Sequence, residues 1–385
     1  MKHALVIHPI MSIYAGGEFL CLNVCSALQE MGYRVSLACD VFRPSEFERL
    51  YGLGNVMEKC DHVNIPDLHI DFPHFVLLQR AAYVERVRKI FSLSDADIVF
   101  STQSSHFIVP RRMFHFVYDA GDVLSYPAGL GPLRSSGSRP GPKGFSYRVV
   151  NKILWGKRPQ SQDWFFAVGS NVLSDLRNRG YRNSSMAFPP CRANFRPRTP
   201  KKKQVVQSAR IVPNKRLELY FEMAARLPDF EFILVGRNDP LLQKQYPGYL
   251  DQLLSKRPNN VTYVEGSTRS RPELVEESKV YVYTGDEKGI VLSLVEAIGA
   301  GCFPFSPVGT GAADVLRALN VGEVFNTMEE AVVRIRLALE RQISKDELNV
   351  LSERAKMLSP EAFKQWITKI AQTGRPILPD GSEAS

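Results

Sequence analysis

Arg210 and Lys215 are the residues of this sequence best suited to bind a diphosphate. They lie on either side of a proline-containing turn in the segment SARIVPNK, which follows an apolar strand-like run and precedes a helical pattern. Ligands of open α/β sheets bind at the carboxyl ends of strands, and an Arg fork beside a Lys point charge matches the oxygens of a diphosphate. Two charges in an ordinary surface loop would give the same pattern, so both interpretations stay open here.

A second candidate segment, EKGIVLSLVEA, begins at Glu287 and follows the strand-like run KVYVYTG. Gly289 would let the start of a helix, predicted over residues 290–300, approach a phosphate closely. Glu296 lies among apolar residues of that helix, where an unpaired carboxylate would be costly to bury. We expect Glu296 to accept hydrogen bonds from ribose hydroxyls, against the alternative of a carboxylate on the helix surface.

Two glycines mark a third candidate position, in the segment AGGE after the first strand-like run. Gly16 and Gly17 precede a helix predicted over residues 18–31, so backbone N–H groups there would reach a phosphate or a sugar. A tight turn from strand to helix also needs glycines, which leaves a purely structural role open.

Apolar strands that alternate with helices would position these residues. The alternation runs through the first half of the chain and restarts in the second half, which predicts βαβ units and parallel sheets. A Pro- and Lys-rich stretch at 189–203 is the expected linker. We expect an α/β protein with two Rossmann-like domains, residues 1–192 and 193–358, a C-terminal helix over 359–374 that packs back across the cleft, and a flexible tail over 375–385. Strands are expected over residues 3–10, 35–38, 97–102, 113–118 and 164–168, then over 203–208, 230–235, 261–264, 280–283 and 302–305, and helices over 18–31, 75–91, 216–227, 290–300 and 360–372.

Length, charge and cysteine content limit the class of protein. The chain has 385 residues, 44% of them hydrophobic, and a net charge of +9, which suit two globular domains and an anionic partner. No apolar run reaches the ~20 residues of a membrane span, and the first residues do not form a signal peptide, so we expect a cytoplasmic protein. The six cysteines lack metal-site spacing, and we expect Cys21 and Cys25 to pack in a core.

Taken in order, the segments AGGE, S-x-R-x4-K and G-x2-L-x-L-V-E-A-x2-A-G resemble glycosyltransferase family 4 of the GT-B fold. Further segments, CLNVCSALQEMGYRVSLAC, FAVGSNVLSDLRNRGY and CFPFSPVGTG, extend the resemblance over nearly the whole chain. The resemblance implies two facing Rossmann-like domains with a central cleft and a nucleotide-diphosphate sugar bound mainly by the C-terminal domain. It further implies an acceptor held mainly by the N-terminal domain, hexosyl transfer with retention of configuration, and no cofactor or obligatory metal.

Residue roles follow from the same resemblance. Arg210 and Lys215 would clamp the diphosphate and stabilise the leaving group, and Glu296 would hold the ribose. Backbone groups would border the donor at the remaining positions, namely Gly16, Gly17, Gly266, Gly289, Ile290 and Val291.

Two departures from the family pattern remain. The family has an E-x7-E motif whose second glutamate corresponds to Glu296, and the position of the first glutamate falls on Lys288, with Glu287 one residue earlier. Either Lys288 faces the donor sugar and binds an acidic sugar such as a uronate, or Lys288 is solvated and Glu287 takes the role of the first glutamate. The family's N-terminal catalytic histidine has no counterpart, and Tyr118 and Asp119 take the nearest position. His115 should point to the opposite face of its strand from Tyr118, as a core residue.

The segment 134–158 carries basic residues and aromatic residues without Asp or Glu. This pattern suits peripheral contact with an anionic membrane at its cytoplasmic face, a lipid-linked or other phosphate-bearing acceptor, or a solvated loop. We find no nucleic-acid-binding motif and expect no nucleic-acid partner. The alternatives to a transferase are a nucleotide-sugar 2-epimerase of the same fold and a non-catalytic nucleotide-sugar binder.

Overall fold

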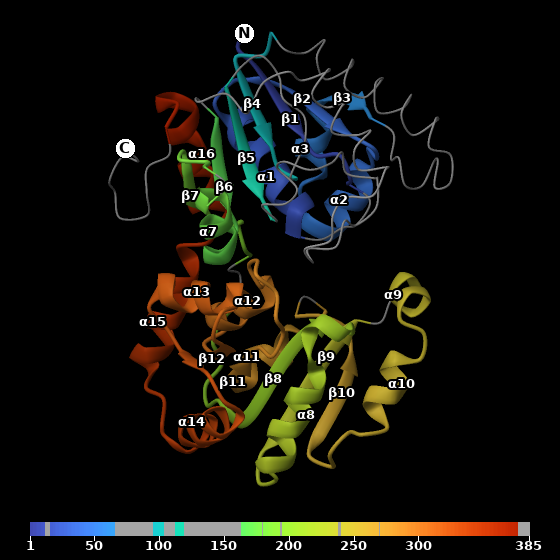
Figure 1. Cartoon of the computed structure of the whole chain (residues 1–385), viewed down its shortest axis with the longest axis vertical. Coiled ribbons are helices and arrows are strands. Elements are labelled where there is room, and N and C mark those ends of the chain that lie inside the picture. The colour runs from blue at the N-terminus through green and yellow to red at the C-terminus, as the bar shows by residue number, and fades with distance from the viewer. Residues whose placement is uncertain are drawn as a thin grey trace. The chain divides into compact units, whose positions relative to one another are not determined.

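The computed structural model describes residues 1–11, 16–65, 95–103, 112–118, 163–178, 180–192, 195–237, 240–268 and 270–375. The chain divides into two compact units, one formed by Met1–Pro190 and Phe363–Ser385 and the other by Cys191–Ala362 (Figure 1). Each unit contains its own parallel sheet, so the α/β class predicted from the sequence is confirmed.

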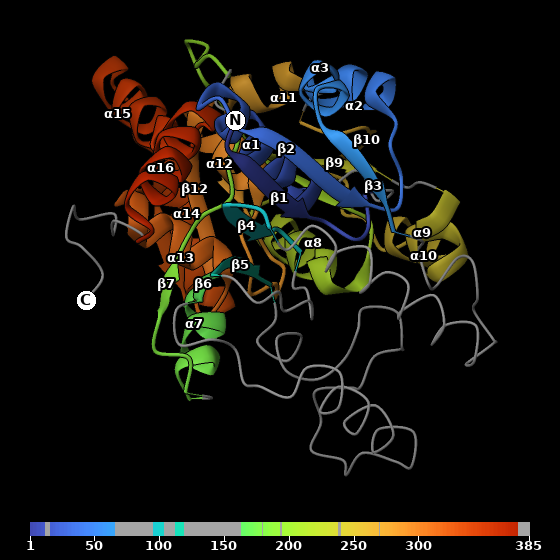
Figure 2. The same ribbon diagram turned by 90° about the horizontal axis from the view of Figure 1, so that it is seen from above.

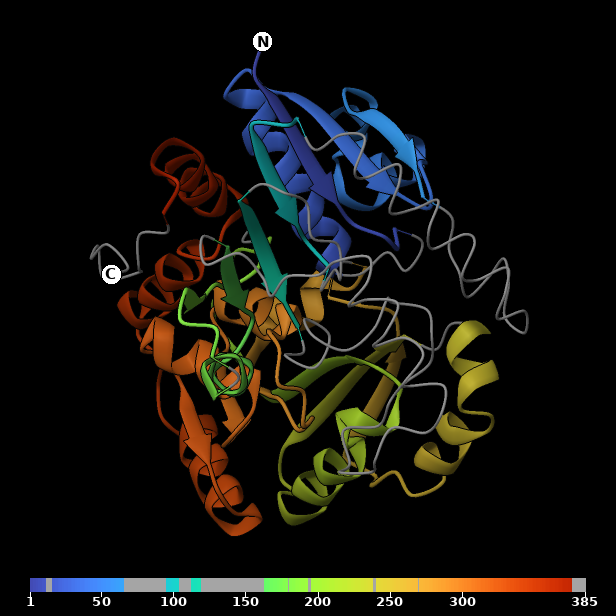
Figure 3. The same ribbon diagram turned by 45° about the horizontal axis from the view of Figure 1, so that its top comes forward.

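The first unit is built on a seven-stranded sheet in the order β3-β2-β1-β4-β5-β6-β7 (Figures 2 and 3). Its strand order reverses between β1 and β4, which is the topological switch point where open α/β sheets bind ligands. The strands are β1 (His3–Ile7), β2 (Arg34–Cys39), β3 (Asp61–Asn64), β4 (Ile98–Ser101), β5 (Met113–Val117), β6 (Trp164–Ala167) and β7 (Ser184–Met186). The helices described are α1 (Gly16–Glu30), α2 (Pro44–Tyr51), α3 (Gly54–Glu58), α7 (Ser170–Asn178) and α16 (Pro360–Thr373), the last of which joins this unit from Phe363 onward.

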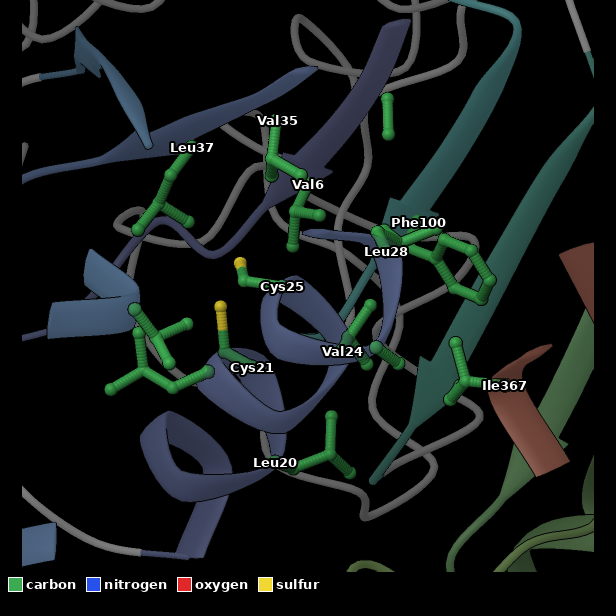
Figure 4. Close-up of a cluster of buried hydrophobic side chains, with 14 of the residues drawn as sticks. Val6, Leu20, Cys21, Val24, Cys25, Leu28, Val35, Leu37, Phe100 and Ile367 are labelled. Atoms are coloured by element: carbon green, nitrogen blue, oxygen red, sulfur yellow. The ribbon is translucent and has the colours of Figure 1, made fainter. Parts of the chain in front are cut away.

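One face of this sheet packs against α1 and α16. Alternate strand residues such as Val6, Val35 and Phe100 enter the core because successive side chains of a strand point to opposite faces. Helix α1 contributes Leu20, Cys21, Val24, Cys25 and Leu28, and α16 contributes Ile367 (Figure 4). Phe363 and Ile370 of α16 belong to the same core. All the cysteines are buried free thiols, which confirms the expected core packing of Cys21 and Cys25.

The second unit repeats the same topology with a six-stranded sheet in the order β10-β9-β8-β11-β12-β13. Counted from the first strand of each unit, both sheets share the same sequence of neighbours, and the second switch point lies between β8 and β11. The strands are β8 (Lys202–Arg210), β9 (Glu231–Arg237), β10 (Val261–Glu265), β11 (Ser278–Val282), β12 (Phe303–Pro307) and β13 (Glu323–Phe325). The helical elements are η1 (Pro213–Lys215), α8 (Leu217–Arg226), α9 (Pro240–Gln245), α10 (Tyr249–Leu254), α11 (Pro272–Glu277), α12 (Leu292–Gly299), α13 (Gly311–Leu319), α14 (Met328–Glu340) and α15 (Lys345–Lys356).

Helices α8 and α14 cover one face of the second sheet. Val205, Phe232 and Val280 enter their shared core with Leu217 of α8 and Ile335 of α14, whereas the neighbouring strand residues point to the other face. Side-chain oxygens cap the N-termini of α13, α14 and α15, at Thr310, Thr327 and Ser344.

Several predicted boundaries need correction. The first strand ends at Ile7 rather than at residue 10, since Pro9 has no N–H to continue the ladder. The helix predicted over 290–300 begins only at Leu292, because Val291 has extended backbone angles of φ −106° and ψ 98°. The helix predicted over 75–91 lies outside the described residues.

Candidate active site

The C-terminal edge of the second sheet brings together the predicted diphosphate ligands. Arg210 is the last residue of β8, Lys215 ends the short helix η1 that follows, and Glu287 lies in the loop after β11. Strands β8 and β11 are direct neighbours at the switch point, so their connections lead away to opposite sides and leave this edge open between them.

The carboxylate of Glu287 is the centre of this cluster. It accepts a hydrogen bond from Lys215 Nζ, one of 3.0 Å from the Tyr283 hydroxyl and one of 3.3 Å from Asn214 Nδ2. Arg210 Nη2 lies 3.9 Å from Glu287 Oε1, the oxygen that also accepts from Asn214. Two cations thus face one carboxylate, and the Arg210 side chain remains 53% exposed while that of Lys215 is 9% exposed.

Buried polar side chains fix Lys215 in place. The Thr284 hydroxyl donates to the Lys215 carbonyl at 2.8 Å, and Gln207 Nε2 donates to Thr284 at 3.0 Å. The Lys215 ammonium also lies 5.4 Å from the centre of the Tyr283 ring, within the range of a cation–π contact. The lysine is therefore presented in one position rather than free to sample many.

Electrostatics keep Glu287 ionised. Burial disfavours its charged form, but the neighbouring Lys215 charge and the hydrogen bonds from Lys215 and Tyr283 outweigh burial and lower the pKa of Glu287 below 4.5. Burial lowers the pKa of Lys215, and the charge of Glu287 opposes this shift. An anion that enters this edge meets cations whose charge is only partly balanced by the protein.

The loop from Glu287 to Val291 rests on the start of α13. The Gly311 N–H donates to the Glu287 carbonyl at 2.9 Å. A Cβ on Gly311 would come within 2.0 Å of the Gly289 oxygen, so only glycine allows this approach. On its other side the loop is tied to η1, because the Asp286 N–H donates to the Asn214 carbonyl at 3.1 Å.

Glu296 is buried in the second turn of α12, with 3% of its surface exposed. It accepts a hydrogen bond from the hydroxyl of buried Thr268, which follows Gly266 after β10. The alternative of a carboxylate on the helix surface is therefore excluded. Gly266 has a φ of +148°, and a Cβ there would lie 2.7 Å from Ser270 Oγ, which explains the glycine at this turn.

The predicted positions of the first unit gather at its own switch point. A Cβ on Gly17 would lie 3.6 Å from the Tyr118 hydroxyl and 3.4 Å from His8 Cε1. Gly16 is the first residue of α1, and Asp119 lies outside the described residues, as does the whole segment 134–158. His115 is buried and stacks on Phe165 with ring centres 4.9 Å apart, as expected of a core residue.

His8 is a residue of this edge that sequence reasoning missed. It directly follows β1, and its Nδ1 lies 2.9 Å from the hydroxyl of Thr102, which directly follows β4. Burial disfavours its charged form, but Cys21 and Glu18 outweigh burial and raise the pKa of His8 to about 10. The position of His8 directly after the first strand and before Gly16 and Gly17 is the sequence feature that could have indicated a place at this edge.

Within the described parts of the chain, no three His, Cys, Asp or Glu side chains are grouped as metal ligands. Over the same residues, no helix combines the length and the apolar character that crossing a bilayer requires.

Comparison with known proteins now gives the class. Residues 193–357 match the family model described as glycosyl transferases group 1. The chain therefore carries a glycosyltransferase domain, which confirms the prediction of a glycosyltransferase enzyme. No curated protein matches the chain in sequence.

Solved structures match over nearly the whole length. HepE from Anabaena in complex with UDP and glucose superposes with a TM-score of 0.66 at 14% identity, covering 97% of this chain and 100% of its own. WaaG, a glycosyltransferase involved in lipopolysaccharide biosynthesis, gives a TM-score of 0.60 at 16% identity, covering 95% and 99%. Sucrose-phosphate synthase from Thermosynechococcus elongatus gives a TM-score of 0.64 at 13% identity, covering 96% and 98%. At these identities the likeness establishes the fold, which is GT-B as predicted.

Proposed function

We propose that this chain is a retaining glycosyltransferase of family 4. It moves a sugar of hexosyl type from a nucleotide-diphosphate sugar to a lipid-linked sugar or another glycan. The observation that carries the proposal is the pairing of Arg210 and Lys215 at the switch point of a domain that matches group 1 glycosyltransferases.

In this proposal the diphosphate of the donor binds Arg210 and Lys215 and displaces Glu287 from them. An ionised carboxylate that already contacts both cations marks the position where an anionic ligand gains most. The N–H groups of Gly289, Ile290 and Val291 border the phosphates, Glu296 holds the ribose, and the turn at Gly266 borders the base. We propose uridine as the base, supported by UDP in a structure of the same fold.

The chemistry follows from charge. When the bond from sugar to diphosphate breaks, negative charge develops on the leaving oxygen, and cations already held in place stabilise it without reorganisation. Because two protein cations meet the diphosphate, we propose that no divalent metal is obligatory, so that activity should persist after dialysis against EDTA.

The acceptor is proposed to bind the first unit near Tyr118, with Asp119 as a further candidate, whereas Gly16 and Gly17 keep their predicted role beside the donor. The basic segment 134–158 supports an acceptor with a phosphate or a lipid anchor, reached at the cytoplasmic face of a membrane.

The test is nucleotide binding by titration calorimetry with UDP, GDP and ADP and their sugar conjugates. We expect one base to bind, with affinity at least tenfold weaker in Arg210→Ala, a loss of ~1.4 kcal/mol. Lys215→Met combined with Glu287→Gln should weaken binding similarly and avoids leaving a buried carboxylate unpaired. Lys256→Ala is the matched control, because Lys256 is exposed between α10 and β10, at the opposite edge of the sheet.

Donor turnover then separates the alternatives. Slow hydrolysis of the donor without acceptor, and transfer with retained anomeric configuration when acceptor is present, would support the proposal. Epimerised sugar in the absence of acceptor would replace it with a 2-epimerase, and binding without any turnover would leave a nucleotide-sugar binder. Failure of every nucleotide to bind would overturn all three.

A further inference from the structure

We infer that Lys288 recognises a carboxylate on the donor sugar, so that the donor is a nucleoside diphosphate linked to a uronic acid. This inference rests on the proposed function and names the class of sugar for the same site.

The first step is that Glu287 is occupied. Its two oxygens are taken by Lys215, Tyr283 and Asn214, with Arg210 beside them. This carboxylate is directed to Arg210 and Lys215, where it balances the two cations. Tyr283 and Asn214 also donate hydrogen bonds to Glu287, and we expect these contacts to hold it beside Lys215, away from the sugar, when the diphosphate displaces it from the two cations.

The second step is that Lys288 is exposed and makes no hydrogen bond or ion pair with any residue that the structure describes. Two other lysines of this unit donate to backbone carbonyls instead. Lys201 donates to the carbonyls of Glu276 and Ala300, and Lys279 donates to those of Leu339 and Arg341. Lys288 therefore has its donors available for a ligand.

The third step is that the position of Lys288 is fixed although its side chain is exposed. The Glu287 carbonyl on one side is held by the Gly311 N–H at 2.9 Å, and the Gly289 carbonyl on the other side leaves no room for a Cβ on Gly311. The backbone of Lys288 thus stays next to Glu287, and its flexible four-carbon stem would let the ammonium group contact a ligand bound beside Arg210 and Lys215.

The fourth step is chemical. A neutral hexose offers only hydroxyl groups, for which a carboxylate or an amide is as good a partner as an ammonium group. A uronic acid offers a full negative charge, and a hydrogen bond between ions is roughly twice as strong as a neutral one. With the diphosphate already paired with Arg210 and Lys215, a further ammonium group beside it is matched better by a sugar carboxylate than by a sugar hydroxyl group.

The test compares UDP, UDP-glucose, UDP-glucuronate and UDP-galacturonate on the full chain by titration calorimetry. The wild type should bind one of the uronates at least tenfold more tightly than UDP-glucose. In Lys288→Ala that preference should fall to about threefold or less while the affinity for UDP is unchanged, and Lys288→Glu should reverse it. Lys288→Arg should restore most of the preference, and Lys256→Ala should keep it whole.

The outcomes separate this inference from the proposed function. Equal weakening of UDP and of the uronates in Lys288→Ala would place Lys288 on the diphosphate and overturn the inference, with the transferase proposal intact. A wild type without preference for uronates would also overturn it. If UDP and the sugar conjugates all fail to bind the wild type and the nucleotide panel finds no other base, the proposed function itself has failed. If the panel finds another base, the same comparison is made with the uronate conjugate of that base.

Discussion

The switch points of the two units have the same strand order but differ in how exposed their charged groups are. In the second unit the strand ends carry Arg210, Lys215 and Glu287, an ionic cluster with an exposed guanidinium. In the first unit the corresponding ends carry His8 and Thr102, both buried and hydrogen-bonded to each other. One topology therefore presents an exposed cationic cluster in one unit and a buried histidine, paired with Glu18 and Thr102, in the other.

This difference shows that strand order determines where a ligand binds and side chains determine which ligand it is. A diphosphate needs fixed positive charge, which the second unit supplies. The first unit balances its charge internally, because His8 lies 3.8 Å from the buried Glu18 carboxylate, and Gly17 and the Tyr118 hydroxyl lie beside this pair.

The strongest test of the comparison removes the exposed cation. Arg210→Ala should lower kcat/KM by about 10²- to 10³-fold, the usual effect of removing one group that stabilises developing negative charge. Stability should change little, since the guanidinium is half exposed and 3.9 Å from its partner. Initial rates at saturating acceptor, with a melting curve of the same protein, measure both. Retained activity would mean that the charged edge is not where the donor reacts.

The next largest effect is expected at Gly311. A Cβ there would meet backbone atoms of the loop, the Gly289 oxygen at 2.0 Å and the Lys288 oxygen at 2.7 Å, and backbone cannot move aside as a side-chain tip can. Gly311→Ala should lower the free energy of unfolding by about 2–3 kcal/mol and weaken nucleotide binding. Denaturant titration measures the first effect and calorimetry the second. Wild-type values for both would show that the loop does not depend on this close approach.

Glu287→Gln should have a smaller effect, lowering the stability of the protein while raising its affinity for nucleotide. Loss of a partly exposed, charge-assisted contact should lower the free energy of unfolding by about 1–2 kcal/mol at neutral pH, while nucleotide affinity should rise a few-fold because a competing anion is gone. Since the pKa of Glu287 is lowered in the folded state, its stabilisation is present above pH 4.5 and is lost as pH falls through the folded pKa.

Denaturant titration from pH 7 to pH 3 should therefore show that the difference in free energy of unfolding between wild type and Glu287→Gln disappears at acid pH. A difference in free energy of unfolding that is constant with pH, or weaker nucleotide binding in the variant, would contradict the role of Glu287 as the internal counter-ion of Arg210 and Lys215.

Much of this architecture can be predicted from the sequence, because buried parallel strands are apolar and rich in β-branched residues. The runs around Val6, Val205 and Phe232 lie in strands near the expected positions. Strands β3, β7 and β13 are not predicted, because they have only 4, 3 and 3 residues and lie at sheet edges, where DHVN and SSM carry little apolar signal.

The candidate site was only partly predictable for a related reason. Arg210, Lys215 and Glu296 were found because a motif places them at strand ends and helix starts. The orientation of Glu287 toward Lys215 depends on the contact of the loop at Gly289 with the start of α13 at Gly311, which no local sequence pattern encodes. His8 was missed because a single histidine after an apolar strand resembles a core residue.

The smallest expected change in stability, and the sharpest contrast with Gly311, is at Gly17. A methyl group there would make ordinary contacts, 3.4 Å to His8 Cε1 and 3.6 Å to the Tyr118 hydroxyl, so Gly17→Ala should change the free energy of unfolding by less than about 0.5 kcal/mol. The same methyl would occupy the approach to the first N–H groups of α1, and we expect turnover to fall about tenfold, as a small misplacement of a bound substrate produces. Gly299→Ala is the matched control, because its methyl would also meet a neighbour at an ordinary 3.6 Å, that of Ala355, at the far end of α12. Full activity in Gly17→Ala would assign the glycine to the strand-to-helix turn alone.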